Sequence, residues 1–247
     1  MLQQFLSSGN LFEREESIVV YFDELEDRCV AGLSGEDRPR VCVSPLPPCL
    51  LSDPVVLEPF LRTLFFSSLL VNVSERRCLF CVDFASGTGE AARALLSRVL
   101  AKLRCPALAF LSAPLAACVA LGLKTALVLH GSGAALPVTE GALALGTVVL
   151  AQPDDEMAKS AARAVANSPL DLRLALVQNV VLLGVKNFTA EQLRQALPEG
   201  LREHAKFVKN PFGGQSLPWL GSSIVGTTLN KKSAGVPVIK GEEMMKV

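Results

Sequence analysis

Four short stretches of the sequence carry residues that could do chemistry. Cys78 and Cys81 have the C-x-x-C spacing that is used in zinc and redox sites. The acidic run at residues 24–27 (Glu-Leu-Glu-Asp) could hold a cation. Two glycine-containing stretches, His130-Gly-Ser-Gly133 and Ser86-Gly-Thr-Gly89, could present backbone amides to an anion. Each stretch also has a plain structural interpretation, and the elements around it decide between the two.

The C-x-x-C pair lies in the apolar run Cys78-Leu-Phe-Cys-Val-Asp83, which is typical of a buried strand. Successive side chains of a strand point to opposite faces, so residues three apart cannot share a metal there. We therefore favour a structural role for both cysteines over zinc or redox chemistry.

The two glycine-containing stretches are best interpreted as simple turns, because a single Gly-Ser-Gly is a weak signal for anion binding. His130 has no Ser/Asp or Cys partner motif, so we expect a solvent-facing turn histidine and not a catalytic base. The GxxxxGK[ST], HExxH and GxSxG motifs and paired-histidine metal spacings are also missing from the sequence. We expect no catalytic residue and no metal site.

Composition limits the classes of partner. The chain has 247 residues, half of them apolar, with 24 basic and 24 acidic side chains and no net charge. This balance gives no support for nucleic acid or an anionic membrane as the main partner. Seven scattered cysteines, an odd number, and no signal peptide favour reduced thiols in a cytosolic or nuclear protein. The most apolar stretch, residues 106–129, is interrupted by Pro114, Gly122 and Lys124, so we expect no membrane span.

The elements that must position these residues alternate between strand and helix after an opening hairpin. This pattern predicts an α/β fold with a mixed sheet. The expected strands are residues 17–22, 28–33, 77–84, 107–111, 125–129, 135–140 and 179–183. The expected helices are residues 54–71, 88–103, 113–121, 157–166, 189–197 and 217–229, followed by an extended polar tail at 230–247.

Five landmarks in this order resemble the actin-related proteins. Residues 20–40, with Asp23 and Ala-Gly-Leu-Ser-Gly-Glu-Asp-Arg-Pro-Arg, resemble the first phosphate hairpin of actins, and residues 125–141 resemble the second. Residues 168–173 and residues 179–184 resemble two parts of the segment that leads to the adenosine loop, and residues 217–226, with Pro-Trp-Leu-Gly-Ser-Ser-Ile, resemble a characteristic actin helix. Residues 66–77 are most similar to the actin-related subunit at the pointed end of dynactin.

The resemblance implies a reduced actin-like (ribonuclease H-like) α/β fold with mixed sheets. The first lobe would comprise residues 1–121, with 214–247 returning to it, and the second residues 122–213. The small insertions that form the pointed face of an actin subunit would be largely missing, after Ser44 and after Gly141. We expect a subunit reduced in this way to dock on a filament end and to present little surface for the next subunit.

The resemblance also identifies vestigial nucleotide-site positions, Asp23, Gly131, Gly133 and Gly184. Every part of this site departs from the family pattern. The acidic run at 24–27 replaces a Gly/Ser-rich turn and would repel a polyphosphate. His130 replaces the metal-organising aspartate, Pro114 replaces the water-placing glutamine, and Val185 replaces the second glycine of the adenosine loop. We expect no hydrolysis and no cofactor, with ATP binding lost.

The sequence thus favours a non-catalytic subunit that caps or terminates an actin-like filament in a dynactin-type complex serving dynein-based transport. Its partners would be actin-related filament subunits and other cytoskeletal proteins, and its location the cytoplasm and cytoskeleton. Two alternatives stay open: a divergent actin-like scaffold of sperm cytoskeleton or chromatin, and a divergent ATP-binding protein of the actin superfamily.

Overall fold

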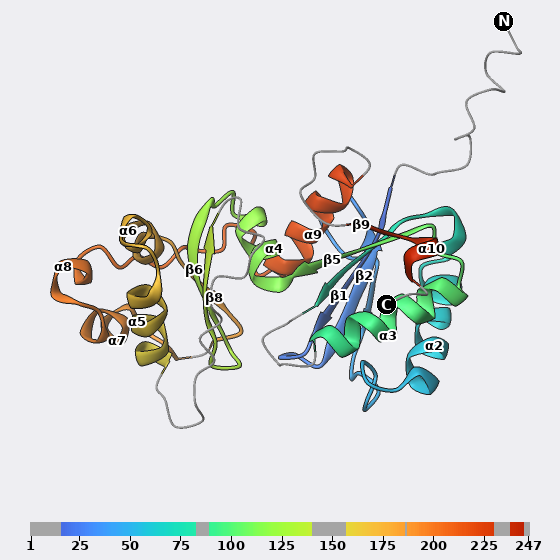
Figure 1. Ribbon diagram of the computed structural model, residues 1–247, viewed down its shortest axis with the longest axis horizontal. Helices are drawn as coiled ribbons and strands as arrows, with labels where there is room; N and C mark the ends of the chain where they lie inside the picture. The colour runs from blue at the N-terminus through green and yellow to red at the C-terminus, as the bar shows by residue number, and fades with distance from the viewer. Residues whose placement is uncertain (1–15, 83–88, 140–156, 186, 230–237, 245–247) are drawn as a thin grey trace, which may run out of the picture.

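A computed structural model describes residues 16–82, 89–139, 157–185, 187–229 and 238–244. The chain folds around two mixed β-sheets that lie on either side of a pair of helices (Figure 1). The first sheet has the strand order β3-β2-β1-β4-β5-β9 and the second has the order β7-β6-β8. The predicted α/β class with mixed sheets is confirmed.

The first sheet is built on an antiparallel hairpin to which parallel strands are added. β1 pairs antiparallel with β2 and parallel with β4, β4 pairs parallel with β5, and β3 and β9 form the edges. The strands are β1 (Ile18–Asp23), β2 (Arg28–Leu33), β3 (Val41–Val43), β4 (Cys78–Val82), β5 (Ala107–Ser112) and β9 (Val238–Lys240).

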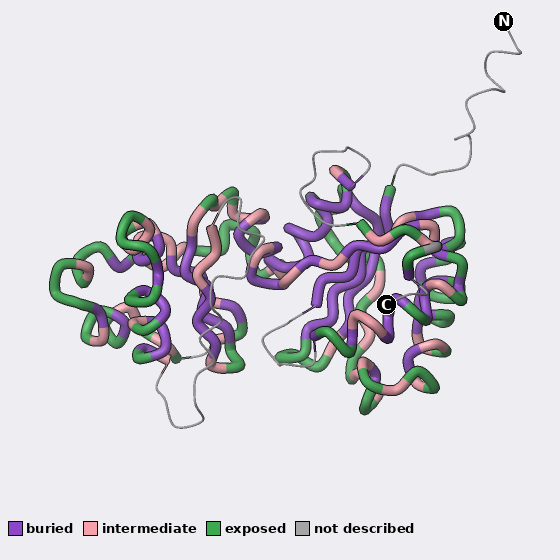
Figure 2. The backbone as a smooth tube through the Cα atoms, viewed as in Figure 1, coloured by how far each residue is buried: buried purple, intermediate pink, exposed green. Residues whose placement is uncertain are grey.

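The central strands are buried on both faces, as the tube in Figure 2 shows, and their side chains alternate between two cores. In β4, Cys78 and Phe80 belong to one core and Leu79 and Cys81 to the other. The expected separation of the C-x-x-C side chains is confirmed. The first core is covered by α2 (Pro54–Arg62) and α3 (Gly89–Lys102), and the second by the helices that face the other sheet.

One predicted helix changes type along its length. Asp53 accepts a hydrogen bond from the Val55 N–H as an N-cap, but α-helix ends at Arg62 and a π-helical segment, Thr63–Ser68, follows. The wider turn places Leu64 and Phe65 side by side in the core. The predicted helix over residues 54–71 is thus confirmed over residues 54–68, but its type changes at Thr63 and it ends three residues earlier than expected.

The second sheet repeats the arrangement at the centre of the first. β6 (Thr125–His130) pairs antiparallel with β7 (Ala135–Thr139) and parallel with β8 (Val180–Leu183). A core of aliphatic side chains joins this sheet to its helices. These are α5 (Met157–Asn167), α6 (Leu170–Gln178), α7 (Ala190–Ala196) and α8 (Glu199–Arg202). The expected capping box of α7, Thr189 with Gln192, is present.

Two helices connect the sheets. α4 (Ala113–Ala120) runs from β5 to β6 and packs along α9 (Leu217–Thr228). The helices approach so closely that a Cβ atom at Gly221 would overlap the Ala116 carbonyl oxygen. One side of α4 enters the core of the first sheet, while its other side enters the core of the second.

The tail is not simply extended, as the sequence had suggested. β9 pairs antiparallel with β5, and α10 (Gly241–Met244) follows, with the Met244 side chain fully buried in the first core. Burial of this one apolar residue and pairing along the edge of β5 order a polar segment. The two-lobe boundaries stay a prediction. No helix in the described ranges is long and apolar enough to cross a membrane.

Candidate functional site

The candidate site lies where a turn of the first sheet meets a turn of the second. The β1–β2 turn, residues 24–27, and the β6–β7 turn, residues 131–134, occupy the same place in the two matching hairpins. Gly184 follows β8, directly beside the second turn. Asp23 ends β1 at the first turn, and Gly131, Gly133 and Gly184 lie in or beside the second turn; that these four are vestigial nucleotide-site positions stays a prediction.

Ion pairs and a hydrogen bond among its own residues hold the β1–β2 turn. Asp23 is buried at the end of β1, with Oδ2 at 3.2 Å from Arg28 Nε and Oδ1 accepting the Glu26 N–H at 3.2 Å. Arg28 Nη2 also lies 2.7 Å from Glu26 Oε2. Two carboxylates thus share one guanidinium, an arrangement that fixes the turn. No group of three or more potential metal ligands occurs among the described residues, which gives the cation interpretation no support.

The second turn uses its amides internally. The Gly131 N–H donates to the Leu183 carbonyl at 2.8 Å, and the Gly133 N–H donates to the His130 carbonyl at 2.9 Å. The Ser132 N–H donates to His130 Nδ1 at 3.3 Å. An anion cradle needs several backbone amides that point at the ligand. These three consecutive amides already have partners, so the simple turn predicted from the sequence is the better description.

His130 is not a solvent-facing turn residue. It is 3% exposed, because it is the last residue of β6 and pairs in register with Leu183 of β8. Its Nδ1 accepts the Ser132 N–H and lies 2.8 Å from Ser132 Oγ. In the neutral ring the proton is therefore on Nε2. The histidine holds the turn that follows it, and the expectation of an exposed side chain was wrong.

Leu25 fills the space between the two turns. A Cβ atom at Gly184 would overlap Leu25 Cδ1, and one at Gly131 would lie 3.1 Å from the same methyl group. Gly131 also lies against the Gly184 backbone, since its added Cβ would be 2.7 Å from the Gly184 carbonyl oxygen. We name this notch, formed by Gly131 and Gly184, the glycine seat. A methyl group of the first sheet thus occupies the glycine seat of the second.

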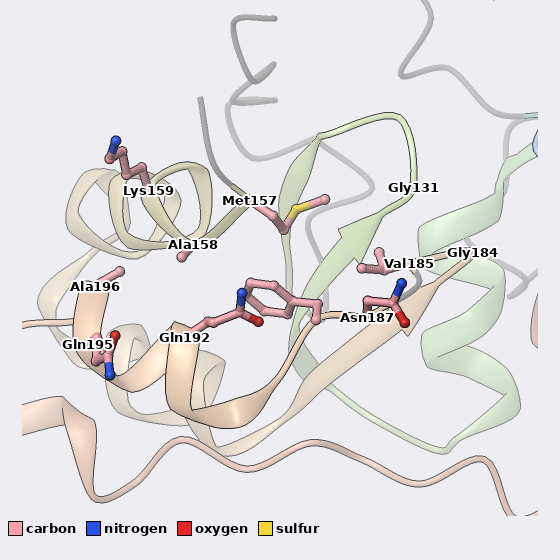
Figure 3. Close-up of a pocket in the computed structure, with 11 residues that line it drawn as sticks. Gly131, Met157, Ala158, Lys159, Gly184, Val185, Asn187, Gln192, Gln195 and Ala196 are labelled. Atoms are coloured by element: carbon pink, nitrogen blue, oxygen red, sulfur yellow. The ribbon is translucent and has the colours of Figure 1, made fainter. Parts of the chain in front are cut away.

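A cavity of about 580 Å³ adjoins the glycine seat (Figure 3). Gly131 and Gly184 form one wall, and apolar side chains and carboxamides form the remainder. The lining is completed by Met157, Ala158, Lys159, Val185, Asn187, Phe188, Gln192, Gln195 and Ala196. Lys159 turns its amino group away from Val185 and Gln192 in Figure 3. Among the described lining residues, Lys159 is the one charged residue, and Asn187, Gln192 and Gln195 contribute carboxamides.

The remaining sequence-based candidates lie elsewhere. Pro114 is buried in the first turn of α4, where a proline fits because the missing N–H would have no helical partner. Cys78 and Cys81 are buried in β4. Residues 86–88 of the Ser86-Gly-Thr-Gly89 stretch lie outside the described residues. Sequence reasoning missed Leu25, for which the only signal was an apolar residue inside an acidic turn.

No protein-family model matches the sequence, and no curated protein matches it either.

Proposed function

We propose that the protein is a non-catalytic, actin-related structural subunit that caps or terminates an actin-like filament. The setting would be a dynactin-type complex that supports dynein-based transport. The observation that carries this proposal is the closed state of the two facing turns. Leu25 occupies the glycine seat, and the amides of residues 131–133 are bonded within the second sheet.

Charge at the first turn supports the same conclusion. Glu24, Glu26 and Asp27 flank Leu25 in the sequence, and Arg28 forms ion pairs with Asp23 and Glu26. A triphosphate beside these carboxylates would meet repulsion, and it would have to displace Leu25 to reach the second turn. Pro114, at the start of α4, offers no side-chain hydrogen bond to orient a water molecule. A nucleotide-driven cycle has no support in these residues.

The arrangement of the two sheets is compatible with a reduced actin-like fold. Each sheet has a hairpin followed by a parallel strand, in the orders β2-β1-β4 and β7-β6-β8, and the hairpin turns face each other. Only residues 44–53 connect β3 to α2, so no additional lobe is inserted there. We infer that the subunit has one docking face and lacks the surface on which a following subunit would sit.

Co-sedimentation with purified actin-related filaments tests the proposal. We expect the full chain to pellet with the filaments in an amount that scales with the number of filament ends, which is varied by shearing at constant filament mass. An unchanged or absent signal after shearing would remove the capping proposal. Association with conventional actin-like scaffold partners of sperm or chromatin, but not with these filaments, would favour the alternative setting.

A second candidate function has one observation in its favour. The cavity beside the glycine seat has the volume of a small-molecule site, and its carboxamides could orient a ligand. This supports a divergent ATP-binding member of the actin superfamily. Titration with fluorescent ATP and Mg²⁺ separates the two candidates, because saturable binding in the low micromolar range is expected only of an ATP-binding protein.

A further inference from the structure

Among the described residues, two contacts between the sheets lie far apart and differ in kind. The first is the pair α4 and α9, which packs backbone against backbone at Gly221 and Ala116. The second is Leu25, which reaches from the β1–β2 turn to the glycine seat. In Figure 1 the β1–β2 turn is at the lower end of the first sheet, away from α9. The helix pair alone would allow the two sheets to rotate about it, whereas a second, distant contact fixes the angle between the sheets.

The glycine seat is suited to an apolar plug. Gly184 has a φ of +63°, a backbone conformation that a side chain disfavours, and its carbonyl lies against Gly131. The floor of the seat is thus bare backbone, held by the hydrogen bond from the Gly131 N–H to the Leu183 carbonyl. Leu25 is 40% exposed and is the one apolar residue in its turn. The apolar surface that it buries lies against the glycine seat.

The turn that carries Leu25 is itself held in place. Asp23 is bonded to both Arg28 and the Glu26 N–H, and Asp27 accepts the Leu46 N–H at 3.3 Å. These bonds anchor the turn to β2 and to the segment after β3. Movement of the turn backbone is therefore restricted, which holds the Leu25 Cα at a fixed position beside the seat.

We propose that Leu25 is an intramolecular latch that fixes the angle between the two sheets without a ligand. With Leu25 seated, the chain has one preferred arrangement; without it, the sheets hinge about α4 and α9. The latch goes beyond the proposed filament function, since it depends only on contacts within the chain. A subunit that is closed by its own side chain has no need of a bound ligand to hold its shape.

Small-angle X-ray scattering of the full-length Leu25→Ala variant tests the latch. We expect a larger radius of gyration and a broader distribution of interatomic distances than in the wild type. Leu174→Ala is the matched control, because Leu174 of α6 is 42% exposed and loses the same atoms away from the seat. The control should scatter like the wild type. Trp219 fluorescence verifies that both variants are folded.

Hydrogen exchange supplies the second readout. We expect amides of the β1–β2 turn and of the residues beside Gly184 to exchange about tenfold faster in Leu25→Ala, and unchanged in Leu174→Ala. Leu25→Met, which keeps an apolar side chain of similar size, should show wild-type scattering and wild-type exchange. Wild-type scattering and wild-type exchange in folded Leu25→Ala would overturn the latch, whatever the outcome of the filament experiment.

Discussion

Gly184→Ala is the substitution that isolates the contact between the sheets. Gly184 and Gly122 have almost the same backbone conformation, with φ of +63° and +65°, but their surroundings differ. A Cβ atom at Gly122 meets nothing within 4 Å, whereas one at Gly184 overlaps Leu25 Cδ1. Gly122→Ala therefore measures the backbone strain alone, and Gly184→Ala measures strain plus the loss of the Leu25 seat.

The magnitudes follow from these two terms. An alanine at positive φ costs about 1–2 kcal/mol, which is the whole expected effect of Gly122→Ala. Leu25 is 40% exposed, so expulsion from the seat removes about 1–2 kcal/mol of the burial free energy of a leucine. We expect Gly184→Ala to lower the free energy of unfolding by about 2–4 kcal/mol.

The assay is urea unfolding followed by Trp219, the single tryptophan, which is 1% exposed in the folded protein. The double variant Leu25→Ala/Gly184→Ala completes the cycle. With Leu25 shortened, the overlapping Cδ1 atom is gone and the Leu25 Cβ stays 3.5 Å from the new Cβ atom at residue 184, an ordinary contact. The double variant should be about 1–2 kcal/mol more stable than the sum of the single effects implies. Equal costs at Gly184 and Gly122, or full additivity in the cycle, would refute the seat.

Three further predictions concern the cores and the thiols. Gly221→Ala must push α9 away from the Ala116 carbonyl and should lower the free energy of unfolding in urea by more than about 3 kcal/mol. Gly200→Ala, in α8 with open space around it, is the control and should be neutral or slightly stabilising. Similar results for both variants would contradict the close helix packing. Burial raises the pKa of Cys118 to about 12 from 9.0, so the unfolded chain loses this thiol proton first as the pH rises, and stability present below pH 9.0 declines above it. Cys118→Ala should remove about 2 kcal/mol of the stability loss between about pH 8 and about pH 10.5, with Cys49→Ala, an exposed cysteine, as the control that leaves the pH dependence unchanged. Under native conditions a thiol reagent should label Cys42 and Cys49 rapidly and the five buried cysteines slowly; rapid labelling of Cys78 or Cys81 would contradict the buried position of β4.

Much of the first sheet could be predicted from the sequence because its signals are local. β2 has the predicted bounds, and the alternation of faces along β4 follows directly from strand geometry. Asp53 and Thr189 were identified as helix starts since capping depends on residues within one turn. The hairpin of β6 and β7 was found for the same reason.

Of three elements or residues that were not predicted correctly, α6 lacks a helical pattern, and the tail and His130 depend on tertiary contacts. α6 was not predicted because Leu170 and Leu174 are exposed, so the helix lacks the single apolar stripe by which helices are found in a sequence. The tail is ordered by its pairing with β5 and by one buried side chain, Met244. His130 is buried by a neighbouring strand that is distant in the sequence.

At the candidate site the individual positions could be predicted but not their occupant. Asp23 and the glycines were singled out from the resemblance, and Gly131 and Gly184 do lie together. From the sequence, the loss of glycines from the first turn indicated only that the turn would repel and obstruct a polyphosphate. It did not indicate which group would occupy the space. That Leu25 enters the seat depends on the relative placement of two hairpins, which share no local sequence signal.

If the proposed function holds, the protein binds an actin-like filament end as a closed subunit, independent of nucleotide. Single-filament imaging of the fluorescently labelled full chain, with and without MgATP, tests this expectation. We expect one labelled molecule at one end of each actin-related filament, with the same dissociation rate in both conditions. Binding along the filament sides, no binding, or end binding that requires MgATP would contradict it.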